Sequence, residues 1–256
     1  MKDKGYKKFR ERLLDRELLI GTIISLPVPE LAAAACRAGF DWLFLDMEHG
    51  TIGLKDLNGL FDALPPECAG VVRVPENGEM WIKKALDAGA SGIIVPHTNT
   101  AKEAALAARW CRYAPAGERS LGFTRANRFG DLLPGYLESA NRETVYIPQI
   151  EHIEAVRNIE AIVDVPGVDA VFVGPFDLSA SLGLPGKTEA PEVLRAIGAV
   201  KEACLRKNLP AGIFCRNGIA AEKAIGEGFT LVCVGLDVLM FKSAAEETVK
   251  KLRREY

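Results

Sequence analysis

The sequence predicts a single (β/α)8 barrel of the TIM type. Three observations support this fold class. Eight short apolar runs alternate with amphipathic helical stretches along the chain. The runs are apolar through most of their length, which is typical of parallel strands buried on both faces. The chain has 256 residues, a length that suits one large α/β domain spanning residues 1–256 better than two ordinary domains.

Each predicted strand is a short run rich in β-branched and aromatic residues. No Gly-x-Gly-x-x-Gly segment follows the first run, so a doubly wound open sheet is the second choice. In order, the strands are predicted at Leu19 to Ile24, Trp42 to Asp46, Gly70 to Val74, Gly92 to Pro96, Thr144 to Ile150, Ala170 to Val173, Pro210 to Phe214 and Leu231 to Gly235.

Between the strands, apolar residues recur at helical spacing, and several of these stretches end at a glycine, a common helix stop. A longer segment, Tyr113 to Asn141, is predicted to be irregular and is too long for a simple connector. The last stretch, Val238 to Tyr256, is predicted to be an amphipathic helix that packs on a neighbouring subunit. The other predicted helices include Glu30 to Ala38, Glu79 to Ala88, Ala101 to Cys111, Pro191 to Lys207 and Ile219 to Glu227.

Composition excludes several function classes. The formal net charge is -2, so nothing favours binding to nucleic acid or to an anionic membrane. No apolar run has the length of a membrane span, and the charged segment Met1 to Arg16 lacks the apolar core of a signal peptide, which predicts a cytoplasmic protein. The six cysteines are scattered without a Cys-x-x-Cys pair, and most are expected to be small core residues in a reducing compartment.

Polar residues gather where the predicted strands end, which is where barrel enzymes carry their chemistry. Each strand tip has a structural reading as well. A lone arginine is often a salt-bridge partner, and acids at helix starts often serve as caps. The tips supply Asp46, Glu48 and His49 after the second strand, Arg73 at the third, His97 after the fourth, Gln149 and Glu151 at the fifth, and Gly174, Pro175, Phe176 and Asp177 after the sixth.

Taken together, these tips favour a functional site. Glu151 and Asp177 follow adjacent strands, and two carboxylates with water form a site for a hard cation such as Mg²⁺ or Mn²⁺. Arg73 and His49 lie opposite, a set suited to binding an α-keto acid and moving a proton. The turn from Gly174 to Asp177 opens a helix, whose free backbone N–H groups favour a carboxylate.

Several segments carry a resemblance to a known family. The sequence resembles the HpcH/HpaI aldolases, metal-dependent pyruvate aldolases related to citrate lyase β-subunits. The likeness runs from about Leu19 to Lys242. It rests on Phe40-Asp41-Trp42 with Asp46 and Glu48-His49, Val72-Arg73-Val74-Pro75, Arg112-Tyr113 with Pro115, Gly117 and Arg119, Arg125-Ala126 with Arg128-Phe129-Gly130, Gln149-Ile150-Glu151, and Gly174-Pro175-Phe176-Asp177-Leu178-Ser179.

The resemblance implies a barrel of the phosphoenolpyruvate/pyruvate type and a role for each site residue. It also implies a homohexamer, a trimer of dimers that exchange their C-terminal helices. By the same resemblance, Glu151 and Asp177 hold Mg²⁺, Mn²⁺ or Co²⁺, and Gln149 lies beside the metal. The resemblance also implies that Arg73 binds the keto oxygen of pyruvate and that His49 with Asp46 forms the acid/base pair. It implies that the backbone of Phe176, in the Gly174-Pro175-Phe176 turn, binds the pyruvate carboxylate.

The implied activity is reversible cleavage of a 4-hydroxy-2-oxo acid, either a dioic acid or a 2-keto-3-deoxy sugar acid, to pyruvate and an aldehyde through a metal-bound enolate. No lysine ends a predicted strand, which disfavours a Schiff-base route. Two alternatives stay open: a citrate-lyase-like enzyme acting on a coenzyme A thioester, and a non-catalytic barrel that binds a keto acid. The aldehyde is undetermined. Glu48 orients either the loop or a neighbouring arginine.

Overall fold

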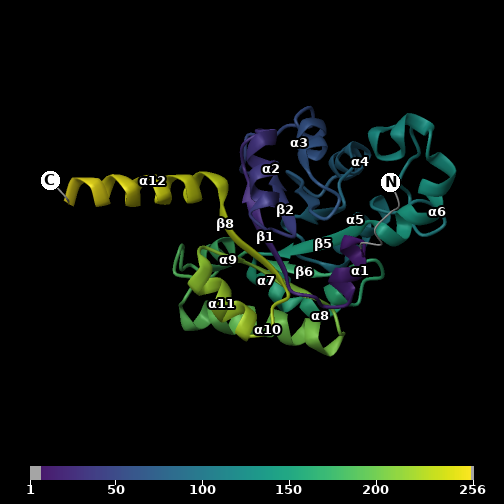
Figure 1. Ribbon diagram of the computed structural model, residues 1–256. Helices are drawn as coiled ribbons and strands as arrows, with labels where there is room; N and C mark the ends of the chain where they lie inside the picture. The colour runs from purple at the N-terminus through teal and green to yellow at the C-terminus, as the bar shows by residue number, and fades with distance from the viewer. Residues whose placement is uncertain (1–6, 255–256) are drawn as a thin grey trace.

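A computed structural model of the chain describes residues 7–254. Its strands form one closed parallel barrel in which sequence order is also spatial order (Figure 1). The predicted barrel and all of its strands are therefore confirmed, and the open sheet is excluded. The strands are β1 (Leu19–Ile24), β2 (Trp42–Asp46), β3 (Ala69–Arg73), β4 (Gly92–Val95), β5 (Val145–Ile150), β6 (Val171–Val173), β7 (Ala211–Cys215) and β8 (Leu231–Leu236).

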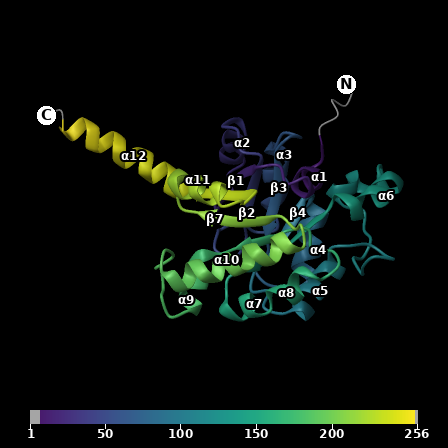
Figure 2. The same ribbon diagram turned by 90° about the horizontal axis from the view of Figure 1, so that it is seen from below.

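Helices connect the strands and surround the barrel (Figure 2). The helices named from the sequence form within about two residues of their predicted ends, although positions 255–256 of the last one lie outside the described residues. The helices are α1 (Phe9–Leu14), α2 (Pro29–Arg37), α3 (Leu57–Ala63), α4 (Glu79–Ala88), α5 (Ala101–Trp110), η1 (Arg125–Gly130), α6 (Leu133–Glu143), α7 (Ile153–Arg157), α8 (Ile159–Val163), α9 (Pro175–Ser181), α10 (Pro191–Arg206), α11 (Gly218–Gly226) and α12 (Asp237–Arg254).

The segment predicted to be irregular, Tyr113 to Asn141, contains η1 and most of α6, so that prediction is wrong for its second half. Pro134 stands in the first turn of α6. A proline at this position lacks only an N–H that would have no helical partner, so it begins a helix instead of breaking one.

Large aromatic side chains fill the interior of the barrel. The ring centroids of Phe44 and Phe172 are 5.6 Å apart, and both rings contact Trp42. A Cβ added to Gly21 would lie 2.5 Å from the indole of Trp42, so the size of this side chain requires glycine on the adjoining strand. A second apolar layer packs between the strands and the surrounding helices. The barrel is therefore a filled core, and its chemistry belongs at one end.

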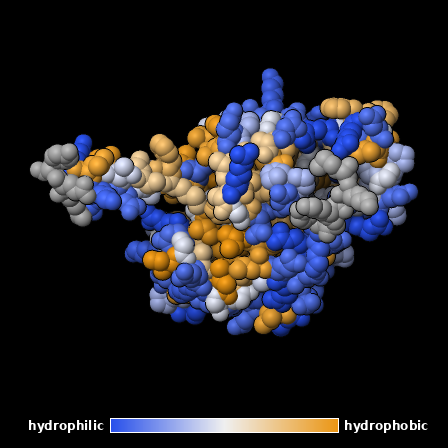
Figure 3. All heavy atoms as spheres, in the orientation of Figure 1, coloured by the Kyte–Doolittle hydropathy of each residue, from blue (hydrophilic) through white to orange (hydrophobic). Residues whose placement is uncertain are grey.

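Helix α12 leaves the barrel and projects away from it (Figure 1). Figure 3 shows apolar atoms along the root of this helix, where Val238, Leu239, Met240 and Phe241 are exposed. These four apolar side chains are not covered by the described part of the chain. Within residues 7–254, no helix combines the length and the apolar character needed to cross a membrane.

Candidate active site at the carboxyl ends of the strands

The inward-facing positions of three strands change from apolar to polar at the same end of the barrel. Side chains alternate along a strand, so every second residue points inward. Asp46 continues the inward series of Trp42 and Phe44, both members of the interior cluster. Arg73 follows Ala69 and Val71 in the same way on β3, and Gln149 and Glu151 follow Val145 and Ile147 on β5. The strand period therefore delivers these polar groups to one place.

The central pair of the site is Arg73 and Asp46. The register between β2 and β3 places these two residues side by side. Arg73 donates from Nε to Oδ1 of Asp46 at 2.9 Å and from Nη2 to Oδ2 at 2.7 Å. Both side chains are buried, and the guanidinium lies 5.0 Å from the centre of the Phe44 ring. A bidentate pair in such surroundings holds one fixed positive charge at the end of the barrel.

Asp46 also shapes the loop that carries His49. Its Oδ1 accepts the backbone N–H groups of Glu48 and His49 at 3.0 and 3.3 Å. The imidazole of His49 is 65% exposed, and its Nε2 lies 3.8 Å from Oε2 of Glu48. Among the described contacts, none joins the Asp46 carboxylate to this ring. In the structure, Asp46 therefore accepts hydrogen bonds from Arg73 and from the loop backbone. The interpretation of the sequence paired Asp46 with the imidazole instead.

Glu48, His97 and Glu151 form a cluster beside this pair. His97 places Nε2 at 3.4 Å from Oε1 of Glu48 and Nδ1 at 3.3 Å from Oε1 of Glu151. Glu48 Oε2 lies 3.0 Å from Nη1 of Arg73, which agrees with the idea that Glu48 orients a neighbouring arginine. The backbone of His97 has a φ of 51°, a left-handed conformation that is unfavourable outside glycine. One donor atom from each of the three residues lies within 4.8 Å of the others.

Glu151 is the most enclosed carboxylate of the site. It accepts the backbone N–H of His97 at 2.8 Å and the Nε2 group of Gln149. Burial raises the pKa of Glu151, and the N–H of His97 opposes that rise. A Cβ added to Gly174 would lie about 3 Å from both Gln149 and Glu151, so the turn after β6 closes tightly over them.

The donor set fits a divalent cation. The Oε1 atom of Gln149 is buried and has no hydrogen-bond partner among the described residues. The buried carboxylate of Glu151 stands beside this unpaired oxygen, and Glu48 and His97 are close by. Carboxylate and amide oxygens are ligands that hard cations prefer, and an imidazole is acceptable to Mn²⁺ or Co²⁺.

A cavity of about 320 Å³ opens over this end of the barrel. Asp177 lies in the first turn of α9, is exposed, and contributes to the raised pKa of Glu151. Glu151 is held against two lining residues, Gln149 and Gly174. The structure therefore brings the residues predicted for the site together around one opening. Its lining includes Asp46, His49, Arg73, Gln149, Gly174, Pro175, Phe176 and Asp177.

Sequence reasoning left Glu48 and His97 without defined roles, although it placed both at strand tips. The structure adds them through the ion pair to Arg73 and the contacts to Glu151. Arg119 is a different case. Its side chain is 1% exposed, pairs with Asp87, and packs on the ring of Tyr113, which makes it a structural residue of its own chain.

Comparisons with known proteins agree with this geometry. Over 247 residues the chain is 35% identical to the 4-hydroxy-2-oxovalerate aldolase of Novosphingobium aromaticivorans, covering 96% of this chain and 94% of that protein. It is 37% identical over 249 residues to the 5-keto-4-deoxy-D-glucarate aldolase of Klebsiella pneumoniae, with 96% and 97% covered. The crystal structure of a family protein from Burkholderia cenocepacia J2315 superposes with a TM-score of 0.92 at 36% identity, covering 95% of this chain and 98% of that one.

The match extends to the whole barrel and its strand tips. Residues 20–244 match the family described as HpcH/HpaI aldolase/citrate lyase, a range that includes β2 to β8 and nearly all of β1. Every polar strand tip described above falls inside this range. The chain belongs to the HpcH/HpaI aldolase/citrate lyase family.

Proposed function

We propose that the protein is a metal-dependent aldolase that reversibly cleaves a 4-hydroxy-2-oxo acid to pyruvate and an aldehyde, a carbon–carbon lyase reaction. The observation that carries the proposal is a buried arginine that lines one cavity, with the buried carboxylate Glu151 and its cluster of possible cation ligands close beside it. The relatives named above are aldolases of 4-hydroxy-2-oxovalerate and of a keto-deoxy sugar acid, which supports both substrate classes for this chain.

We assign the cation, Mg²⁺, Mn²⁺ or Co²⁺, to Glu151 together with Asp177. The two carboxylates come from the tips of neighbouring strands, β5 and β6, and the charge of Asp177 contributes to the raised pKa of Glu151. Glu48 and His97 offer further donors around the same carboxylate. When bound, the cation supplies Lewis-acid stabilisation of negative charge on the keto oxygen of the substrate.

The pyruvate half of the substrate is held by Arg73 and by the start of α9. Asp46 occupies Nε and Nη2 of the guanidinium, so Arg73 has a fixed orientation and directs its charge at the keto oxygen. A preorganised donor of this kind stabilises the oxyanion that develops when the carbon–carbon bond breaks. The backbone N–H groups of Phe176 and Asp177 are in the first turn of α9, and we assign the substrate carboxylate to them.

His49 receives the proton from the C4 hydroxyl during cleavage and returns it during addition. Its imidazole is exposed and lines the cavity, and histidine is the side chain that most often transfers protons in general acid–base catalysis. Asp46 acts on this step indirectly, because it holds the backbone of the His49 loop and the guanidinium of Arg73 in one hydrogen-bonded unit.

We further propose that the chain is one domain and assembles as a homohexamer, a trimer of dimers, through α12. The exposed apolar root of this helix supports an intersubunit role, since exposed apolar patches commonly mark contact surfaces.

Exchange of the methyl protons of pyruvate into deuterated water tests the proposal directly. We expect exchange with Mg²⁺ or Mn²⁺, its loss after chelation, and its return when metal is added back. A panel of aldehydes then identifies the acceptor. If no exchange occurs in any metal while an acyl-coenzyme A raises the melting temperature, the thioester alternative replaces this one. If pyruvate binds without exchange or cleavage of any substrate, the chain is a keto-acid-binding barrel.

The variant His49→Ala tests the proton-transfer role. We expect it to bind pyruvate normally, because Arg73 and the start of α9 are untouched, and to lose about 100- to 10,000-fold in the rate of aldol cleavage. Full cleavage activity in this variant would remove His49 from the mechanism. Arg195→Ala, on an exposed face of α10, is the control and keeps full activity.

A further inference from the structure

Two cysteines at the opposite end of the barrel from the site lie in contact. Cys36 is near the end of α2, and Cys68 directly precedes β3. They are 32 positions apart in the sequence, yet their Sγ atoms lie 2.6 Å apart. A disulfide bond is about 2.05 Å long, so a small side-chain rotation is enough to bring these two sulfur atoms to bonding distance.

The two sulfur atoms have different surroundings. All six cysteines lie among the described residues, and Cys36 is the one that is not buried. The contact with Cys68 lowers the pKa of Cys36, whereas the same contact together with burial raises the pKa of Cys68. The carboxylate of Glu67 raises the pKa of both thiols.

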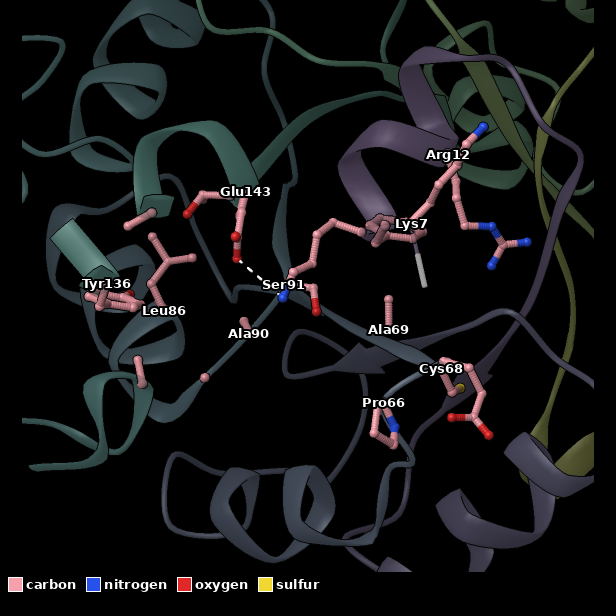
Figure 4. A pocket seen from close by; sticks show the side chains of 17 residues that line it. Lys7, Arg12, Pro66, Cys68, Ala69, Leu86, Ala90, Ser91, Tyr136 and Glu143 are labelled. Atoms are coloured by element: carbon pink, nitrogen blue, oxygen red, sulfur yellow. Dashed lines mark ion pairs between the residues drawn. The ribbon is translucent and has the colours of Figure 1, made fainter. Parts of the chain in front are cut away.

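Cys68 also borders a cavity of about 310 Å³. The residues that start or precede β3, β4 and β5 line this cavity, so it lies at the amino ends of the strands. Figure 4 shows Cys68 beside Pro66 and Ala69, with Lys7 and Arg12 across the opening. Both cations are held by carboxylates, Lys7 by Asp15 and Arg12 by Asp41. The cavity borders Cys68, whereas Cys36 is not among its lining residues and is reached by a small dissolved oxidant through its own exposed surface.

We propose that Cys36 and Cys68 are a modification site, at which a low-molecular-weight disulfide such as glutathione disulfide reversibly oxidises the pair. The thiolate of Cys36 attacks one sulfur of glutathione disulfide, the S–S bond breaks, and one glutathione thiolate leaves. The thiolate of Cys68 then attacks Cys36 Sγ and expels the second glutathione. Two protein protons end on two glutathione thiols, and one protein disulfide replaces one small-molecule disulfide.

This assignment gives each cysteine a distinct role. Cys36 is accessible and is the attacking thiol, while Cys68 is enclosed and already in contact, so it resolves the mixed disulfide. The bond would join the end of α2 to the start of β3 and enclose β2 in a covalent loop. It lies at the amino ends of the strands that carry Asp46 and Arg73, far from the cation ligands. We therefore expect oxidation to stabilise the barrel and to leave the catalytic groups in place.

Intact-mass spectrometry of the full-length folded protein tests the inference. The protein is equilibrated with glutathione and glutathione disulfide over a range of ratios, quenched with acid, and alkylated. We expect wild type to lose the mass of two hydrogens, with one cross-linked peptide that contains Cys36 and Cys68. The oxidised form should melt about 5 to 10 °C higher than the reduced form. Reduction should reverse both changes.

Single variants distinguish the two roles. Cys68→Ser retains the attacking thiol and should accumulate a stable glutathione adduct on Cys36, whereas Cys36→Ser should resist modification. Cys204→Ser, which removes a buried cysteine of α10, is the matched control and should oxidise like wild type. A wild-type protein that stays fully reduced, keeps a glutathione adduct, or pairs other cysteines would overturn the proposal. Because aldolase activity is not the readout, this outcome is independent of the proposed function.

Discussion

Replacing Arg73 by lysine tests whether the orientation of the charge matters as well as its presence. In the native site the guanidinium makes two hydrogen bonds to Asp46, at 2.9 and 2.7 Å, and lies 3.0 Å from Glu48. A lysine ammonium retains the positive charge but cannot reproduce the planar fork. The substitution therefore leaves Asp46 neutralised while it loosens the geometry on which the oxyanion contact depends.

The structure sets the expected magnitudes. Losing one of the two charge-assisted bonds to Asp46 should lower the free energy of unfolding by about 1.5–3 kcal/mol. Misplacing the donor at the keto oxygen should lower kcat/KM about 100- to 1000-fold, in line with the removal of one oxyanion donor. Arg73→Met removes the charge altogether and leaves a buried carboxylate without a partner, so we expect a larger loss of stability, about 3–5 kcal/mol.

Steady-state cleavage kinetics and urea unfolding of the same preparations separate the two effects. Arg195→Lys changes an exposed arginine whose ion pair among residues 7–254 is with Glu192 on its own helix, so this control should change neither quantity. If Arg73→Lys keeps the wild-type kcat/KM, the bidentate geometry is irrelevant to catalysis. If Arg73→Met is as stable as wild type, the buried pair is not a structural element, and the reasoning from burial is wrong.

Three further predictions concern the cation and the assembly. Gly174→Ala pushes a methyl group against Gln149 and Glu151 and should weaken Mn²⁺ binding about 10- to 100-fold by calorimetry, while Gly198→Ala, with open space around its Cβ, should not. Burial raises the pKa of Glu151, so the affinity for the cation should rise as pH rises through that pKa, and binding should release a proton. The stability of the metal-free protein should fall over the same pH interval, because the folded state favours the protonated acid. Equal cation affinity on both sides of the transition would contradict this. Deleting α12 after Asp237 should convert the oligomer to smaller species in analytical ultracentrifugation. An unchanged number of subunits per assembly would exclude this helix as the contact.

The barrel was predictable because its strands carry an unambiguous local signal. Strands β1 and β2 occupy their predicted residues, and most of the others differ by one residue at an end. Several of the misplaced boundaries fall at a proline or a glycine, as at Pro96, Pro210 and Gly235, where one hydrogen bond decides the assignment. Helix α6 was missed because Pro134 and Gly135 read as breakers in the sequence, while tertiary contacts with α1 and η1 hold the helix in place.

The composition of the site was predictable, but its internal pairing was not. Inward alternation along β2, β3 and β5 forces Asp46, Arg73 and Gln149 to one end of the barrel. Which acid pairs with which base depends on register across strands and on loop geometry, neither of which is local in sequence. The β2–β3 register places Asp46 beside Arg73. His97 contacts Glu151 because its backbone is left-handed, a conformation that a histidine in the sequence does not predict.

The unequal burial of the site also bears on how such a barrel acquires new substrates. Arg73 and Asp46 are part of the core, so replacing either one carries a folding penalty as well as a chemical one. The rings of His49 and His97 are each 65% exposed on loops that extend beyond the strands. We therefore expect substitutions in these loops to cost less folding stability than substitutions at Arg73 or Asp46. A library designed to change the acceptor should randomise the loop positions around His49 and His97 while it keeps these two residues, Arg73 and Asp46 intact.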